Sequence, residues 1–286
     1  MAVALLLAMT GCSGGGGSEG AGAPPPRGGF FPGGESPLAG NWSGSATDTT
    51  TGQVLVATAL IDDSGDAQLI VVPAITIIRP VPSASDAGLI SAFGTAAPFF
   101  VVHGNLCCEA NFQGTASAEP MGTGIKSTSQ IIGGLSSGML VGTFDFDGRP
   151  YSFSLAPNPT YNRALTLQDL AGVYTNTLPD LFGGATTTYT IAVSADGVVT
   201  GAHVNGCIYN GAVSIPDTSR NLFRLNMQLS NCNTANGSFG PRNGEYSGLG
   251  VLYRDAVVAT DPTTIRQIFY YSLIGPVWLG TQGAQR

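Results

Sequence analysis

The stretch Phe223-Arg224-Leu225-Asn226-Met227-Gln228-Leu229-Ser230 decides the fold class, because large apolar and polar residues alternate along it without a break. Successive side chains of a β-strand point to opposite faces, so this alternation places one face in a core and the other in water. The stretch therefore predicts a half-buried strand of a sheet.

The same alternation recurs along the chain, for example at 151–155 and 189–193, and hairpin-forming pairs such as Asp147-Gly148 and Asp196-Gly197 stand between such runs. A single helical turn is expected at 166–170. Eight short strands joined in sequence order predict an up-and-down meander, which loses its edges by closing into a barrel. In the second half of the chain we expect these strands near 171–177, 186–194, 197–204, 207–215, 221–230, 244–253, 265–273 and 276–280.

Two segments of the first half are repeated in the second. Leu38-Ala39-Gly40-Asn41-Trp42 returns as Leu170-Ala171-Gly172-Val173-Tyr174, and His103-Gly104-Asn105-Leu106-Cys107 returns as His203-Val204-Asn205-Gly206-Cys207. The first copy carries about 32 extra residues between these landmarks, within an apolar insertion at 64–100. The sequence therefore predicts an all-β protein with two tandem antiparallel eight-stranded β-barrel modules, at 36–160 and 166–282.

The N-terminal region predicts a membrane anchor. Residues 2–9 are apolar and of the length of a signal-peptide core, and Met9-Thr10-Gly11-Cys12 resembles the lipobox of bacterial lipoproteins. The resemblance implies a signal peptide at 1–11, removed before Cys12, and acylation of Cys12 by palmitate and related chains. Residues 12–35 are rich in Gly and Pro and predict a flexible tether. Ser13 after the cysteine, by resemblance to enterobacterial sorting, favours the outer membrane.

Gly40-Asn41-Trp42, which opens the first strand, resembles the start of a lipocalin or related calycin barrel. The resemblance implies that Trp42, and Tyr174 in the second module, lie under the closed end of their barrels. The whole chain is similar to a group of uncharacterised proteobacterial outer-membrane lipoproteins with two such modules. A fainter likeness connects it with surface lipoproteins of the transferrin-binding type, through the acylated cysteine and its glycine run.

Four cysteines remain besides Cys12, in a compartment that permits disulfides. Cys207 and Cys232 fall opposite each other in a hairpin that turns at 215–219, so we expect them to form a disulfide. Cys107 and Cys108 are adjacent, and on a strand their side chains point to opposite faces. They form either a strained vicinal disulfide or leave one thiol free.

Composition excludes some classes of function. The 286 residues include 11 Lys+Arg and 18 Asp+Glu, without basic clusters, which gives no electrostatic basis for binding nucleic acid. There is no nucleophile elbow, zinc-binding His-Glu-x-x-His or phosphate loop. The carboxylates of Asp62-Asp63-Ser64-Gly65-Asp66 lack the rest of a calcium-loop pattern and predict a polar hairpin tip. We therefore expect no enzyme activity, no metal and no cofactor.

The most apolar part of the chain beyond the signal core lies within 69–102 and consists of the runs Leu69-Ile70-Val71-Val72-Pro73-Ala74-Ile75-Thr76-Ile77-Ile78 and Phe99-Phe100-Val101-Val102. Such segments must be covered, either by further strands of the barrel or by a partner, so a small apolar ligand or a protein partner at 69–102 is a hypothesis. An eight-stranded barrel encloses either side chains or one small ligand. Bulky residues on the inward rows favour a filled core.

The expected function is that of a membrane-anchored lipoprotein with a non-catalytic binding or envelope-structural role. One alternative is a surface receptor for a solute or protein, resembling the transferrin-binding type. Another is a calycin-type protease inhibitor, although the segment before Trp42 that would plug a protease is fused here to the lipid anchor.

Overall fold

The computed structural model describes residues 36–73, 100–106, 111–120, 126–179, 186–204, 206–232, 243–255, 266–276, 279–280 and 284–285. All of them belong to one compact unit, Gly33–Arg286. The expected signal peptide, the lipobox and the tether lie outside the described residues, as do Cys107 and Cys108. Within the described part of the chain, no helix is long and apolar enough to cross a membrane.

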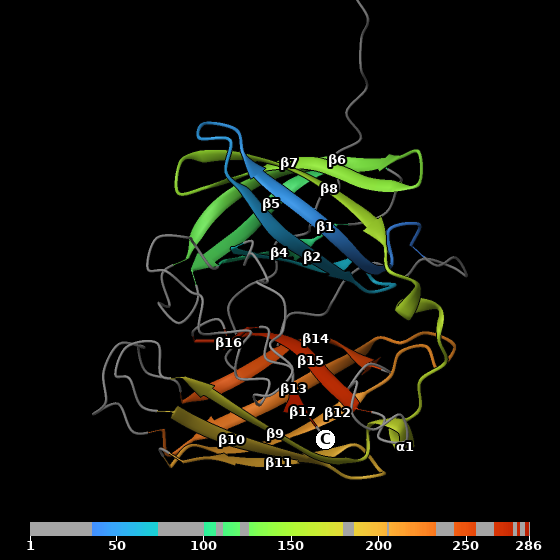
Figure 1. Ribbon diagram of the computed structural model, residues 1–286, viewed down its shortest axis with the longest axis vertical. Helices are drawn as coiled ribbons and strands as arrows, with labels where there is room; N and C mark the ends of the chain where they lie inside the picture. Colours follow the sequence, from blue (N-terminus) through green and yellow to red (C-terminus); the bar gives the residue numbers. More distant parts are fainter. Residues whose placement is uncertain are drawn as a thin grey trace, which may run out of the picture. The chain divides into compact units, whose positions relative to one another are not determined.

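The first module is a closed antiparallel barrel in which each strand pairs with the next along the chain (Figure 1). Its strands are β1 (Gly40–Asp48), β2 (Val54–Ile61), β3 (Asp66–Pro73), β4 (Phe100–Asn105), β5 (Asn111–Pro120), β6 (Ser127–Ser136), β7 (Met139–Phe146) and β8 (Arg149–Pro157). The last strand closes on the first, in a register that runs from Trp42↔Pro157 to Asp48↔Tyr151. The predicted up-and-down barrel is therefore confirmed for this module.

Turn residues with left-handed backbone dihedrals set the hairpins. Asp147 and Gly148, with φ of 51° and 71°, form the two-residue connection between β7 and β8. Two positive φ values in succession give the turn whose twist matches that of paired strands. Ser137 and Gly138, with φ of 51° and 77°, connect β6 and β7 in the same way.

The second module is also an antiparallel meander, and its sheet curls around its own core (Figure 1). Its seven longer strands are β9 (Gly172–Pro179), β10 (Thr186–Val193), β11 (Val198–His203), β12 (Ile208–Ser214), β13 (Phe223–Ser230), β14 (Gly244–Asp255) and β15 (Arg266–Ile274). The prediction of two barrel-like modules is confirmed. The modules differ in how they close, because two short pieces, β16 (Leu279–Gly280) and β17 (Ala284–Gln285), follow β15 in place of a long eighth strand at 276–280.

A short connection leads from one module to the next. It contains a single 3-10 turn, η2 (Pro159–Asn162), and the one-turn helix α1 (Leu167–Leu170) expected from the sequence. Thr166 and Asp169 form a capping box that satisfies the first amides of α1. The helix ends at Leu170, which is fully buried in the core of the second module.

The two pairs of repeated sequence segments differ in whether they lie on equivalent strands of the two modules. The Leu-Ala-Gly segments stand directly before β1 and β9, the first strands of their modules. His103, in contrast, lies on β4, the fourth strand of its module, whereas His203 ends β11, the third strand of its own. The second pair of landmarks therefore occupies non-equivalent strands, because a short sequence match does not fix the strand count before it.

Candidate functional site

The aromatic residues expected at the barrel ends make the same contact in both modules. The indole Nε1 of Trp42 donates to the carbonyl of Leu38, 2.9 Å away, and the hydroxyl of Tyr174 donates to the carbonyl of Leu170, 2.7 Å away. Both leucines are fully buried, and both aromatic side chains are buried with them. Each Leu-Ala-Gly-x-aromatic segment thus ties a buried leucine to the first strand of its module by a hydrogen bond that spans four residues.

Glycine is required at the centre of the first of these segments. A Cβ atom added to Gly40 would lie 2.8 Å from Trp42 Nε1, the same atom that donates to Leu38. A side chain at this position would therefore displace the indole from its hydrogen bond.

The interior of the first module is filled by aromatic rings. Phe100 stacks on Phe146 with ring centroids 4.0 Å apart, and Phe144 stacks on Tyr151 at 5.1 Å. A void of about 10 Å³, lined by side chains such as Ala59, lies inside this barrel. Such a void is at most the size of one water molecule, so the side chains that line it are closely packed.

The interior of the second module is richer in tyrosine. Tyr189, Tyr246 and Tyr271 are buried in its core, and the half-buried Tyr209 packs against it. Burial raises the pKa of Tyr271 well above its usual range, and the neighbouring phenols of Tyr189 and Tyr209 raise it further. The phenol of Tyr271 is therefore a neutral hydrogen-bonding group within an apolar core at physiological pH.

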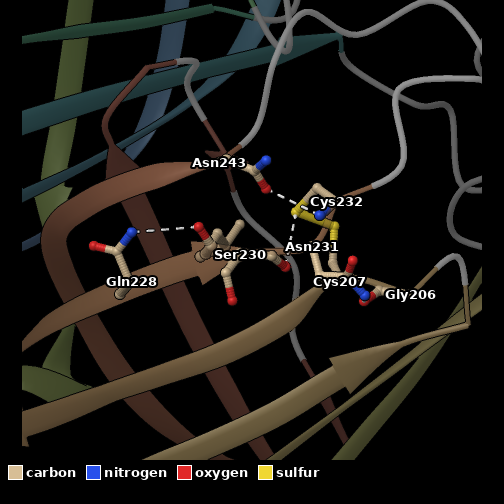
Figure 2. Close-up of a disulfide and its surroundings, with 8 residues drawn as sticks. Gly206, Cys207, Gln228, Ser230, Asn231, Cys232 and Asn243 are labelled. Atoms are coloured by element: carbon tan, nitrogen blue, oxygen red, sulfur yellow. Dashed lines mark hydrogen bonds between the residues drawn. A yellow bond between two sulfur atoms is a disulfide. The ribbon is translucent and has the colours of Figure 1, made fainter.

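The predicted disulfide is present. Cys207 lies just before β12 and Cys232 just after β13, and their sulfur atoms are bonded (Figure 2). Both cysteines are buried and belong to the core of the second module. Two hydrogen bonds stabilise the backbone beside the bridge. Asn231 Nδ2 donates to the carbonyl of Gly206, and the amide of Cys232 donates to Asn243 Oδ1. The bridge therefore fixes the ends of two paired strands.

The hairpin tip between β2 and β3 is polar, as predicted, but its central carboxylate is buried. Asp62 Oδ1 accepts hydrogen bonds from the amide and hydroxyl of Ser64 and from the amide of Asp66, at 2.7–3.1 Å. Its side chain is 1% exposed. The tip is thus an ordered turn organised around a carboxylate, which needs a compensating positive charge.

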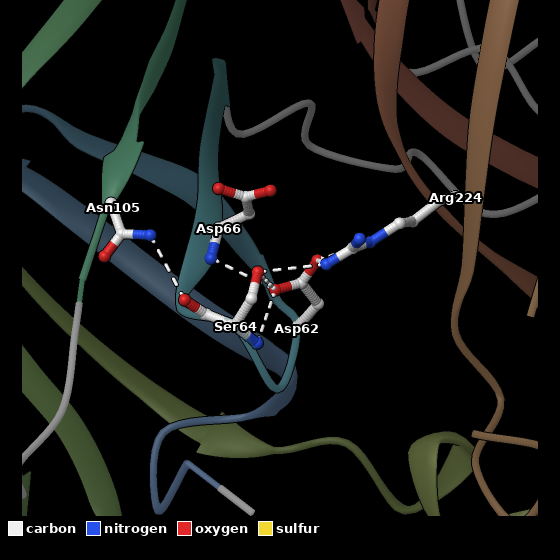
Figure 3. A network of polar contacts seen from close by, with 5 residues as sticks. All are labelled: Asp62, Ser64, Asp66, Asn105 and Arg224. Atoms are coloured by element: carbon white, nitrogen blue, oxygen red, sulfur yellow. Dashed lines mark hydrogen bonds and ion pairs between the residues drawn. The ribbon is translucent and has the colours of Figure 1, made fainter. Parts of the chain in front are cut away.

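Arg224 supplies that charge from β13 of the second module (Figure 3). Its Nε donates to Asp62 Oδ2 at 2.8 Å, and its Nη2 donates to the same oxygen and to Ser64 Oγ. We call this set of Asp62, Ser64 and Arg224 the clasp. The two oxygens of the Asp62 carboxylate therefore accept hydrogen bonds from the turn and from Arg224. In a calcium loop, by contrast, carboxylate oxygens coordinate the ion.

The apolar segment at 69–102 is buried on both faces where the structure describes it. Leu69, Val71 and Val102 point into the first barrel, whereas Ile70 and Val101 belong to a third apolar cluster. That cluster also contains Leu60 from β2 and Leu222, Leu249 and Val251 from the second module. The apolar run is continuous because both faces of these strands are covered, as in any strand buried on two sides. The partner hypothesis stays a prediction for 74–99, which lie outside the described residues.

Polar contacts surround this third cluster. Asn41 Nδ2 donates to the hydroxyl of Tyr253 at 3.0 Å, and burial raises the pKa of Tyr253. Lys126 Nζ donates to the carbonyl of Gly275 and lies 4.0 Å from Glu119 Oε2, a fully buried carboxylate. Hydrogen bonds and an ion pair therefore border the apolar contacts between strands of the two modules.

His103 lies on the same outward face of β4 as Val101, opposite Gln68 of β3. Its Nε2 has no hydrogen-bond partner among the described residues. Burial, reinforced by the positive charge of Lys126, lowers the pKa of His103 to about 4. The imidazole is therefore neutral in the folded protein near neutral pH.

This shift predicts a loss of stability in acid. An unfolded chain binds a proton on His103 near pH 6.5, whereas the folded protein does so only near pH 4, so stability falls as pH drops through that window. We expect His103→Gln to reduce the difference in unfolding free energy between pH 7 and pH 4.5 by about 1–2 kcal/mol, less than the full shift implies because the ring is partly exposed. Urea titrations at both pH values measure this, and an unchanged difference in the variant would contradict it.

The outer surface of β5–β7 carries an open depression of about 630 Å³. Gln113, Ile132 and Thr143 lie side by side across it in register, and all three are exposed. Its lining contains no charged residue. A surface of this kind can contact a neutral molecule but offers no group for chemistry.

Two of these arrangements were not foreseen from the sequence. Arg224 was placed on a solvent-facing polar row, yet it pairs with a buried carboxylate 162 positions away. The one signal that could have singled it out is its charge, since the other polar residues of that strand are Asn226, Gln228 and Ser230. The third cluster could not be located from sequence, because its members come from several strands of both modules.

The described residues contain no group of three or more His, Cys, Asp or Glu side chains placed to hold a metal ion. Comparison with protein-family models, with curated proteins and with solved structures finds no match for this chain.

Proposed function

We propose that this protein is a lipid-anchored lipoprotein of the bacterial outer membrane, acylated on Cys12, with a non-catalytic binding or envelope-structural role. The observation that carries the proposal is Met9-Thr10-Gly11-Cys12 followed by the glycine run 14–17. A triacylated cysteine gives stable membrane attachment, because it supplies more than the two signals that such attachment needs. The Gly- and Pro-rich composition of residues 12–35 predicts a flexible tether, and a tether of this length would let the modules sit roughly 25–30 Å from the anchor.

Several features of the modules support a role without catalysis. The described interior of the first barrel is packed with phenylalanine rings, and that of the second holds the neutral phenol of Tyr271. The carboxylate of Asp62 accepts hydrogen bonds within the clasp, and Cys207 and Cys232 are bonded to each other in a disulfide. Contacts with other molecules would therefore use the outer surface of the modules, where the neutral depression over β5–β7 lies.

The anchor is tested by Cys12→Ser in the full chain expressed in a Gram-negative host. We expect the variant to lose palmitate labelling and to move from the membrane fraction to the soluble fraction, because no acyl chain can be attached to serine in this position. Ser13→Ala is the matched control and should stay labelled and membrane-bound. A Cys12→Ser protein that remains in the membrane fraction with unchanged labelling would refute the anchor.

The second candidate function is a surface receptor for a solute or protein, which the open depression over β5–β7 favours because it is accessible and neutral. Protease treatment of intact cells separates the two roles. Digestion of the modules on intact cells places them on the surface, as a receptor requires, whereas protection until the outer membrane is permeabilised places them in the periplasm.

A further inference from the structure

The second module has a seam between β9 and β15. Neighbouring strands from β9 to β15 pair over at least five residues each, but β9 and β15 do not pair with each other. Among the residues that the structure describes, only β17 lies between them. It pairs with β15 at Ile268↔Gln285 and Phe269↔Ala284, and with β9 at Gln285↔Thr175.

We infer that residues 284–285 act as a latch that closes the second barrel. They join the first and last long strands of the sheet, so the ring of strands is complete only while they stay in place. In the first module the corresponding closure is made by seven residue pairs between β1 and β8. The latch is therefore the weakest link in the hydrogen-bonded ring.

The latch pairs with an edge of β9 that has no other pairing on that side among the described residues. The sequence of β9 is GVYTNTLP, without a charged residue, and Val173 at its start is exposed. An uncharged strand edge with free amide and carbonyl groups is a template for pairing with other chains. With β17 displaced, β9 would lose its pairing at Thr175 on this side and present such an edge along its whole length.

Side chains close the seam from the inside, independently of the latch. The ring of Phe269 on β15 stacks on Tyr174 of β9 at 4.9 Å and on Phe223 of β13 at 4.7 Å. Tyr174 is also held by its hydrogen bond to Leu170. This aromatic contact should keep the core intact when the latch opens, so that opening exposes the backbone edge without unfolding the module.

The test is amide hydrogen exchange on the full chain, on a chain ending at Gly283, and on Gln285→Pro. Proline has no backbone amide to donate to a strand ladder. In both altered proteins we expect the amides of β9 around Thr175 and of β15 around Ile268 and Phe269 to exchange at least tenfold faster, with β1–β8 unchanged. Gln285→Thr, which keeps the amide and favours a strand, should exchange like the unaltered protein.

Two results would overturn the inference. Unchanged exchange of β9 in the chain ending at Gly283 would mean that residues 284–285 close nothing. A collapse of the tertiary near-ultraviolet circular dichroism of the second module in that chain would mean that these residues belong to its core and are not a latch.

Discussion

Replacing Arg224 by methionine is expected to lower the free energy of unfolding by about 3 kcal/mol. The substitution leaves Asp62 buried, with its side chain 1% exposed, while Oδ2 loses both guanidinium donors. Breaking a buried ion pair from one side costs about 3–5 kcal/mol, because a charge remains without compensation, and the partial exposure of Arg224 places the expectation at the lower end. Urea unfolding of the full chain in detergent, followed by intrinsic fluorescence, measures the change.

Two further variants separate the clasp from a general effect of losing an arginine. Arg149→Met removes an arginine that is 60% exposed and lies 3.9 Å from Asp48, so its loss should cost no more than about 1 kcal/mol. Adding Asp62→Asn to Arg224→Met removes the orphaned charge, while the amide oxygen still accepts the hydrogen bonds of the turn. This double variant should regain most of the lost stability. If Arg224→Met and Arg149→Met lower the free energy of unfolding equally, the clasp adds no more stability than an exposed ion pair.

Removing the Cys207–Cys232 disulfide is expected to destabilise the second module by about 3–4 kcal/mol, within the range known for small secreted domains. The two cysteines are 25 positions apart, so the bridge restricts a loop of that length in the unfolded chain. The double variant Cys207→Ala/Cys232→Ala is preferable to a single one, since a lone thiol could pair with Cys107 or Cys108. Thermal unfolding and hydrogen exchange of β12 and β13 report the effect.

The control for this variant is the first module. Exchange of β1–β8 should change much less than that of β12 and β13, because the bridge lies in the core of the second module alone. Asn231→Ala removes the hydrogen bond to Gly206 and places alanine at a left-handed φ of 55°, so it should cost about 1–3 kcal/mol. A double cysteine variant as stable as the parent protein would contradict the assigned role of the bridge.

Local patterns in the sequence predicted most of the strands. Alternation at 221–230 became β13, and the pair Asp147-Gly148 became a two-residue turn, whereas Asp196-Gly197 ends a longer connection at 194–197. The Cys207–Cys232 bridge followed from the same hairpin geometry. Of the last strand, expected at 276–280, the described residues that pair are Leu279–Gly280, with β15. The end of a meander has a neighbour on one side only, so local alternation constrains it less.

The sequence by itself determined the antiparallel strands, their order and the buried faces of each barrel, because side-chain alternation and turn chemistry act over a few residues. Only the tertiary structure decided what covers the outward faces. Ile70 and Val101 share a cluster with Leu249 and Val251, and Arg224 contacts Asp62, across 148 or more positions. Local periodicity in the sequence does not determine these contacts, because they depend on which outer surfaces of the two folded modules pack together.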